Sequence, residues 1–242
     1  MFDDKVVKRV FNTAKIYPDG TKIVYQYKKE LCIPLVHDRG SKDEGRSEDN
    51  EKNDSNIFRS VRRARVTIYD CVASGNFTTF VTLTFKDQTE DREIALDRLS
   101  QFTRAMRDRY GKFAYLFVFE RHKKGGIHIH GVIKDVGFNI EKSVNAKGNN
   151  IRRNGKQIYD LCDWEFGFSS FESINDNGKI ARYISKYITK EIVREFGRKS
   201  YLCSKGLVRP TKITNDWEVI TSSDEVDYQN DFMKVKTFKS SC

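Results

Sequence analysis

Alternation of apolar and polar positions predicts several strands in the central part of the chain. Residues 77–85 (FTTFVTLTF) alternate and are rich in β-branched and aromatic side chains, which favour strands. Residues 112–120 and 126–134 have the same character, and the short turn between them contains a glycine, so they predict a β-hairpin. Residues 166–171 (FGFSSF) predict one more strand.

Apolar residues that recur about every 3.6 positions predict three helices. The clearest covers residues 90–110, an arginine-rich one covers residues 56–71, and the last covers residues 178–195. Along the chain these helices alternate with the predicted strands and the hairpin. This order predicts an α+β fold, with a ferredoxin-like antiparallel sheet and helices packed on one of its faces.

Composition divides the chain into four segments. Residues 1–36 predict an N-terminal β extension, because short β-type runs occur in their second half. Residues 37–56 are densely charged and lack aromatic and β-branched residues, so they predict a mobile loop. Residues 57–208 contain the predicted sheet and most of the helical sequence, and residues 209–242 form a C-terminal extension of unknown role.

The net charge of the chain is +10. The predicted loop contains seven acidic and four basic residues, so the remainder is more basic still, at +13. Such a surplus favours a polyanionic partner, most simply nucleic acid. Basic residues of the arginine-rich helix and of the hairpin turn are candidate phosphate contacts, although solvated charge is the simpler interpretation of each: Arg62, Arg63, Arg65, Lys123 and Lys124.

Membrane and disulfide signals are weak in this sequence. No apolar run approaches the ~20 residues that a membrane-spanning helix requires, so no membrane partner is expected. The five cysteines lie far apart and form no Cys-x-x-Cys pair, which argues against a zinc ribbon or a disulfide framework. A reducing cytoplasm is the expected setting.

Three of the four histidines lie within nine residues, next to Glu120. Side chains two positions apart share one face of a strand, so His128 and His130 are expected to point the same way. Glu120 ends the other strand of the predicted hairpin. One carboxylate with two imidazoles suits Mg²⁺ or Mn²⁺ acting as an electrophile on a phosphate, whereas a pair of half-buried strand histidines is the simpler alternative.

The segment 181–191 contains Tyr-x-x-Lys twice, as Tyr183 with Lys186 and Tyr187 with Lys190. In the predicted helix the two tyrosines lie one turn apart at the border of an apolar isoleucine stripe. A phenol beside an ammonium group can attack phosphorus to form a phosphotyrosine, and the lysine can stabilise the developing charge. A helix whose tyrosines merely cover the core is the alternative.

Together these motifs resemble those of the HUH endonucleases, specifically the two-tyrosine rolling-circle replication initiators of phages and plasmids. Residues 80–85 look like the family's first motif, Glu120 with His128-Ile129-His130 looks like its metal site, and residues 183–190 look like its nucleophile helix. The resemblance covers residues 57–208, which would then form an HUH endonuclease domain.

The resemblance implies nicking of single-stranded or hairpin origin DNA by a tyrosine, with a 5′-phosphotyrosine, a free 3′-OH and religation at termination. It also implies Mg²⁺ or Mn²⁺, no small-molecule cofactor, and the cytoplasm of a bacterial host. Because the sequence contains no Gly-x-x-x-x-Gly-Lys-[Ser/Thr] phosphate loop, a host helicase and polymerase are expected partners.

Two other functions stay open on the sequence. A relaxase or a transposase would use the same chemistry. A non-catalytic platform for single-stranded nucleic acid would instead use aromatic residues of the predicted strands to stack bases, namely Phe77, Phe80, Phe117 and Phe119.

Overall fold

The computed structural model describes residues 7–34, 49–122, 125–153, 155–197, 200–215, 220–221 and 223–239. The chain forms two compact units. Residues 48–208 make up the larger unit, and residues 1–47 together with 209–242 make up the smaller one. None of the described helices combines the length and the apolar character required to cross a membrane.

The larger unit is built on a seven-stranded antiparallel sheet with the strand order β11-β4-β5-β3-β10-β9-β6. Its α2 helix connects β3 to β4, and β5 lies between these two strands, which is the split βαβ arrangement of ferredoxin-like sheets. The predicted α+β class is therefore confirmed. The strands are β3 (Thr79–Phe85), β4 (Tyr115–Arg121), β5 (Ile127–Ile133), β6 (Ile140–Lys142), β9 (Tyr159–Leu161), β10 (Gly167–Ser173) and β11 (Tyr201–Cys203), and β7 (Arg152–Arg153) pairs separately with β8 (Lys156–Gln157).

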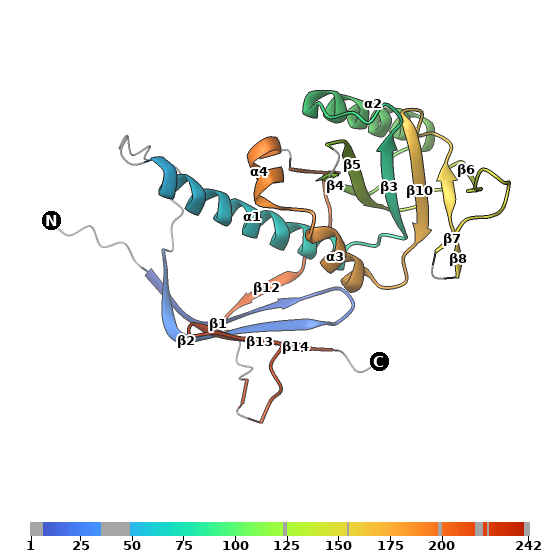
Figure 1. Cartoon of the computed structure of the whole chain (residues 1–242). Coiled ribbons are helices and arrows are strands. Elements are labelled where there is room, and N and C mark those ends of the chain that lie inside the picture. Colours follow the sequence, from blue (N-terminus) through green and yellow to red (C-terminus); the bar gives the residue numbers. More distant parts are fainter. Residues whose placement is uncertain are drawn as a thin grey trace. The chain divides into compact units, whose positions relative to one another are not determined.

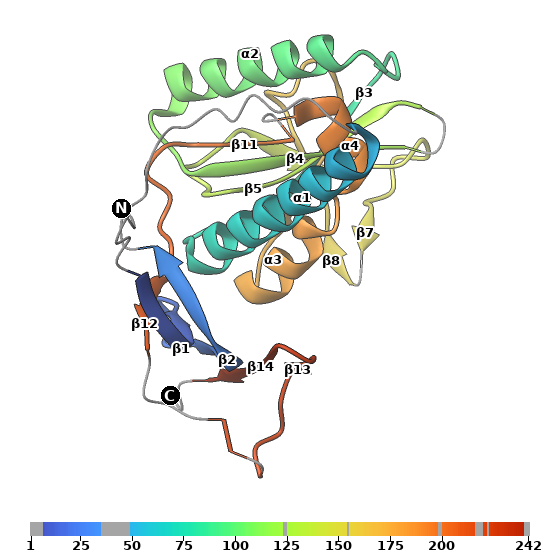
Figure 2. The same cartoon turned by 90° about the vertical axis from the view of Figure 1, so that its left-hand side faces the viewer.

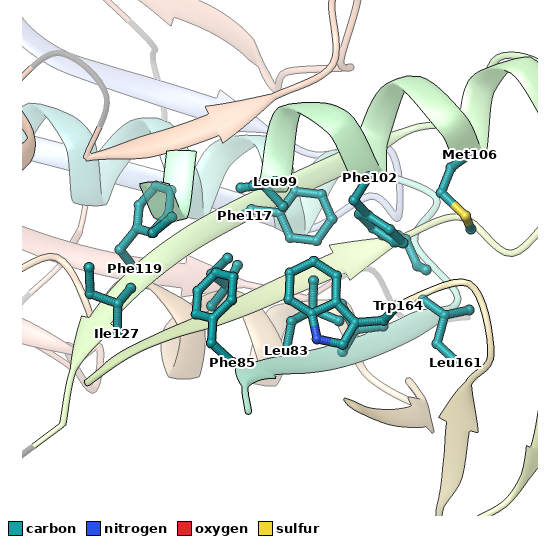
Figure 3. Close-up of a cluster of buried hydrophobic side chains, with 14 of the residues drawn as sticks. Leu83, Phe85, Leu99, Phe102, Met106, Phe117, Phe119, Ile127, Leu161 and Trp164 are labelled. Carbon is teal, nitrogen blue, oxygen red and sulfur yellow. The ribbon is translucent and has the colours of Figure 1, made fainter. Parts of the chain in front are cut away.

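Helix α2 (Arg92–Tyr110) covers one face of this sheet. Asp91 caps its N-terminus by accepting hydrogen bonds from two backbone N–H groups. Its apolar stripe packs on alternate strand residues that point to the same side (Figure 3), and the cluster includes Leu83, Phe85, Leu99, Phe102, Met106, Phe117, Phe119 and Ile129.

The opposite face is covered by α1 (Asp49–Ser74) and α3 (Asn177–Ser185), as Figures 1 and 2 show. The prediction that helices lie on one face only is therefore wrong. The physical reason is that alternate strand residues on this second face are also apolar and need cover, and α1 and α3 provide it with their own stripes. The buried cluster includes Val61, Ile68, Phe80, Leu116, Val118, Val132, Ala181 and Ile184.

Two helix boundaries differ from the prediction. Helix α1 begins at Asp49, so residues 49–56 of the predicted loop are helical, while residues 37–48 lie outside the described part of the chain. High charge density does not oppose a helix, because charged side chains remain solvated on its surface. An ion pair of 2.5 Å between Asp54 and Arg194 also joins this early part of α1 to α4 (Lys190–Phe196).

The predicted helix over residues 178–195 is in fact two helices, α3 and α4, separated by residues 186–189. Ile188 and Thr189 are β-branched and favour extended backbone, and Thr189 caps α4 by accepting a hydrogen bond from the Ile192 N–H at 3.3 Å. The isoleucine stripe is split as a result. Ile184 and Ile188 pack on the α1 side of the sheet, whereas Ile192 packs on the α2 side.

The smaller unit is a five-stranded antiparallel sheet made from both ends of the chain, in the order β12-β1-β2-β14-β13. The N-terminal segment thus forms strands, as its β-type runs predict. The C-terminal segment, to which the sequence assigns no role, supplies the remaining strands of the same sheet. These strands are β1 (Val7–Ile16), β2 (Lys22–Pro34), β12 (Thr211–Thr214), β13 (Tyr228–Gln229) and β14 (Met233–Phe238).

Candidate functional site

The polar residues singled out in the β4–β5 hairpin lie on the same face of the sheet as α1 and α3. Glu120 pairs directly with His128 across the two strands, and His130 pairs with Val118 one step further along. Val118 belongs to the buried cluster under α1 and α3, and Glu120 is two residues further along the same strand. The face is therefore apolar beneath these two helices and becomes polar at Glu120 and His128.

His130 is held by contacts on both ring nitrogens. Its Nε2 lies 2.7 Å from Oε2 of Glu120, and its Nδ1 lies 3.2 Å from the hydroxyl of Thr82 on β3. Burial lowers the pKa of His130, and the Glu120 carboxylate opposes this effect without reversing it. In the neutral ring, Nε2–H donates to Glu120 and Nδ1 accepts from Thr82. Thr82 was not singled out from the sequence, although strand alternation and its position opposite His130 mark it.

His128 is half-buried, and its ring stacks on that of His122 with the centroids 5.1 Å apart. Burial lowers the pKa of His128, and the nearby His122 lowers it further, while Glu120 acts in the opposite direction. A neutral imidazole is the form that can donate an electron pair to a metal ion. His122, which the sequence left without an assigned role, thus contacts one of the proposed ligands.

The two tyrosines are brought together over His130. The ring of Tyr187 stacks on the ring of His130 with the centroids 4.0 Å apart, and its hydroxyl donates to the Tyr183 hydroxyl at 2.6 Å. Tyr183 is 43% exposed, whereas Tyr187 is half-buried in the turn that follows α3. Burial raises the pKa of Tyr187, and the hydrogen bond to Tyr183 and the Glu120 carboxylate raise it further. The more accessible nucleophile is therefore Tyr183.

The predicted lysines are separated by the break between the helices. Lys186 is exposed in the turn directly before Tyr187. Lys190 begins α4, and its Nζ lies 3.6 Å from the centroid of the Phe58 ring of α1, a cation–π contact. Lys190 thus has a packing partner, whereas Lys186 presents its charge to solvent beside the tyrosines.

The predicted phosphate contacts are only partly described. Arg62, Arg63 and Arg65 are exposed on α1, while Lys123 and Lys124 lie outside the described residues. Arg65 has a specific partner, because its Nε donates to the carbonyl of Ile188 at 2.8 Å, in the break between α3 and α4. The structure therefore gives Arg65 a bracing contact in addition to the predicted role.

Metal binding can be tested on the donor set. Among the residues that the structure describes, no three His, Cys, Asp or Glu side chains are arranged to hold a metal ion. One carboxylate and two imidazoles on a single face nevertheless have the chemistry that a divalent cation requires. Glu120 and His130 at present use their ligand atoms on each other, so the Mg²⁺ or Mn²⁺ site stays a prediction.

The aromatic residues proposed for a non-catalytic platform do not reach the surface. Phe77, Phe80, Phe117 and Phe119 are at most 8% exposed, and all four belong to the two buried clusters. That version of the platform is therefore wrong. The reason is that strand alternation delivers these rings to two covered faces of the sheet rather than to one open face.

Known families give one match once this geometry is considered. Residues 78–192 match the family model of the replication-associated proteins of the ORF2 type. The match spans just under half of the chain, from β3 to the start of α4, and therefore contains Glu120, both strand histidines and both tyrosines. It supports a replication-initiator family and a role in the initiation of replication. No curated protein and no solved structure matches the chain.

Proposed function

We propose that the chain is a rolling-circle replication initiator that nicks single-stranded origin DNA with a tyrosine nucleophile. The observation that carries the proposal is the hydrogen-bonded pair of tyrosines stacked on His130, directly beside Glu120. Nucleophile and candidate metal ligands come from segments more than fifty residues apart in the sequence. Their convergence on one open edge of a sheet is what a metal-assisted phosphoryl transfer requires.

Tyr183 would act first. It is the more exposed of the two phenols, and its oxygen already accepts a hydrogen bond from Tyr187 that would stabilise a phenolate. Its oxygen attacks phosphorus as the phenol proton passes to solvent, the bond between phosphorus and O3′ breaks, and the 3′ oxygen takes up a proton. The products are a 5′-phosphotyrosine and a free 3′-OH, which can prime synthesis.

Tyr187 would serve the second transfer, at termination. The phosphotyrosine ester keeps the energy of the bond that was broken, so a 3′-OH can later attack it and religate the strand. Lys186 is exposed beside both tyrosines and would bind the scissile phosphate, with Lys190 in support from the start of α4. Glu120, His128 and His130 would hold Mg²⁺ or Mn²⁺, which supplies positive charge to the phosphate when bound.

The test is a covalent-adduct assay with single-stranded oligonucleotides that carry hairpins from the replicon encoding this chain. The protein is incubated with Mn²⁺, with Mg²⁺ or with EDTA, and the products are separated on a denaturing protein gel. We expect a metal-dependent adduct in the wild type, loss of it in the double variant Tyr183→Phe/Tyr187→Phe, and a larger loss from Tyr183→Phe than from Tyr187→Phe.

The matched control is Tyr228→Phe, which removes the hydroxyl of an exposed tyrosine in the smaller unit. This variant should form the adduct as well as the wild type. Cleavage without any adduct would mean that water is the nucleophile, and the assignment of the tyrosines would be wrong. An adduct that persists in EDTA would contradict the metal site instead.

A further inference from the structure

Phe168 is the most exposed aromatic side chain described in the larger unit, at 73%. It lies in one cross-strand row with the candidate metal ligands, because Phe168 pairs with Thr84, Thr84 pairs with His128, and His128 pairs with Glu120. Directly opposed residues of an antiparallel sheet point to the same face. Phe168 therefore faces the same side as the site and lies two strands away from His128.

A pocket lies within this row. It has a volume of about 240 Å³, and its walls include His128, Thr84, Lys86, Gln88 and the ring of Phe168. A flat apolar ring, a side-chain amide and an ammonium group are the three features that stack, hydrogen-bond and neutralise a nucleotide. An isolated exposed phenylalanine would need no explanation, but one that lines a polar pocket beside the site does.

The backbone holds this phenylalanine firmly. A Cβ atom on the preceding residue, Gly167, would lie 2.1 Å from the carbonyl oxygen of Thr84 and 2.5 Å from the amide nitrogen of Lys86. Strands β10 and β3 thus approach each other here more closely than a side chain would permit, and the Lys86 N–H donates to the Phe166 carbonyl at 3.0 Å. A stacking surface fixed in this way loses little conformational entropy when a base binds.

We propose that Phe168 stacks on an unpaired nucleobase adjacent to the scissile phosphate, while Lys86 binds the neighbouring backbone phosphate. The proposal rests on the proposed function, since that function places the phosphate at Glu120 and His128. Two strand spacings separate His128 from Phe168, which is about 10 Å, a distance that the sugar and base of a nucleotide span. The occupant is single-stranded DNA, because a paired base has its faces covered by its neighbours, and the basic net charge of +10 favours it.

The test compares two fluorescently labelled strands of equal length, a thymidine 20-mer and a 20-mer of abasic residues, in EDTA so that no cleavage occurs. The full-length wild type should prefer the thymidine strand. Phe168→Ala should weaken binding of that strand roughly 5- to 140-fold, the range that base–aromatic stacking provides. Its affinity for the abasic strand should not change, because the backbone contacts remain.

Two further variants separate stacking from a structural role. Phe168→Trp should restore the preference, and its added tryptophan emission should be quenched by the thymidine strand but not by the abasic one. Phe232→Ala, at a phenylalanine that is 76% exposed in the smaller unit, is the matched control and should bind as the wild type does.

The subsite is wrong if Phe168→Ala retains the wild-type preference, or if it loses affinity equally for both strands. It is also wrong if the wild type does not distinguish the strands. The proposed function fails differently, through the absence of a tyrosine adduct. A protein that stacks thymidine on Phe168 but forms no adduct would keep the subsite and lose the nickase, and the reverse result would keep the nickase alone.

Discussion

Replacing Arg65 with methionine separates a bracing role from a DNA-binding one. The Nε of Arg65 donates to the Ile188 carbonyl at 2.8 Å, in the segment where α3 has ended and α4 has not begun. Methionine keeps most of the aliphatic stem and removes the donor, so the carbonyl loses a charge-assisted hydrogen bond. Such a bond contributes about 1.5–3 kcal/mol, and the lower end applies here because Arg65 is exposed and water can replace it.

A loss of about 1.5 kcal/mol should lower the melting temperature by roughly 3–6 °C in a chain of this size. The assay is thermal unfolding of Arg65→Met followed by circular dichroism, with Arg62→Met as the matched control on the same exposed side of α1. The control should melt as the wild type does. Binding of single-stranded DNA at several salt concentrations gives the second measurement, and Arg65→Met should leave the salt dependence unchanged.

A particular combination of results would refute this reasoning. If Arg65→Met melts at the wild-type temperature and the slope of log affinity against log salt falls by about 0.7, the value for one phosphate contact with a single strand, then Arg65 binds phosphate. The brace would then contribute nothing measurable, and the hydrogen bond to Ile188 would be incidental.

Two further predictions concern packing and charge. Gly131→Ala should destabilise the larger unit by about 1–3 kcal/mol in urea unfolding, because a Cβ there would lie 2.3 Å from the Phe117 ring; Gly126→Ala, whose Cβ would meet nothing closer than 3.6 Å, should stay within about 0.5 kcal/mol, and equal effects would contradict the packing argument. The Lys236 ammonium lowers the pKa of Asp224 to about 2, so its contribution to stability is present above pH 3.8 and is lost as the pH falls towards 2. Acid unfolding of Asp224→Asn should therefore depend less on pH between 4 and 2 than that of the wild type, and identical profiles would show that the ion pair does not stabilise the fold.

The central elements could be predicted because their burial is periodic. Strand alternation and the 3.6-residue repeat locate β3, α2, β4, β5 and β10 to within a few residues of the observed bounds. The same parity argument places Glu120, His128 and His130 on one face, in agreement with the strand register. Local pattern is sufficient here because each element has its own apolar stripe.

Contacts between distant segments could not be predicted in this way. Strand β1 pairs with β12, about two hundred residues later, and β2 pairs with β14, without any local signal that links them. The same is true of the hydrogen bond between Glu120 and His130 and of the stacking of Tyr187 on His130. Phe168 was visible only as part of a short strand, and its exposure depends on the partner strands that surround it.

The break after α3 explains how one segment can serve both the core and the site. In an uninterrupted helix, Ile184, Ile188 and Ile192 would form one stripe against one surface. The observed turn instead leaves Ile188 on the α1 side and sends Ile192 to the α2 side, so the segment is anchored in both clusters. Tyr187 lies in the turn between these anchors, where its ring rests on His130 and its hydroxyl meets that of Tyr183. The weak helix formers Ile188 and Thr189 are therefore not a flaw in a helix, because they end it at the residue that must turn towards the histidine.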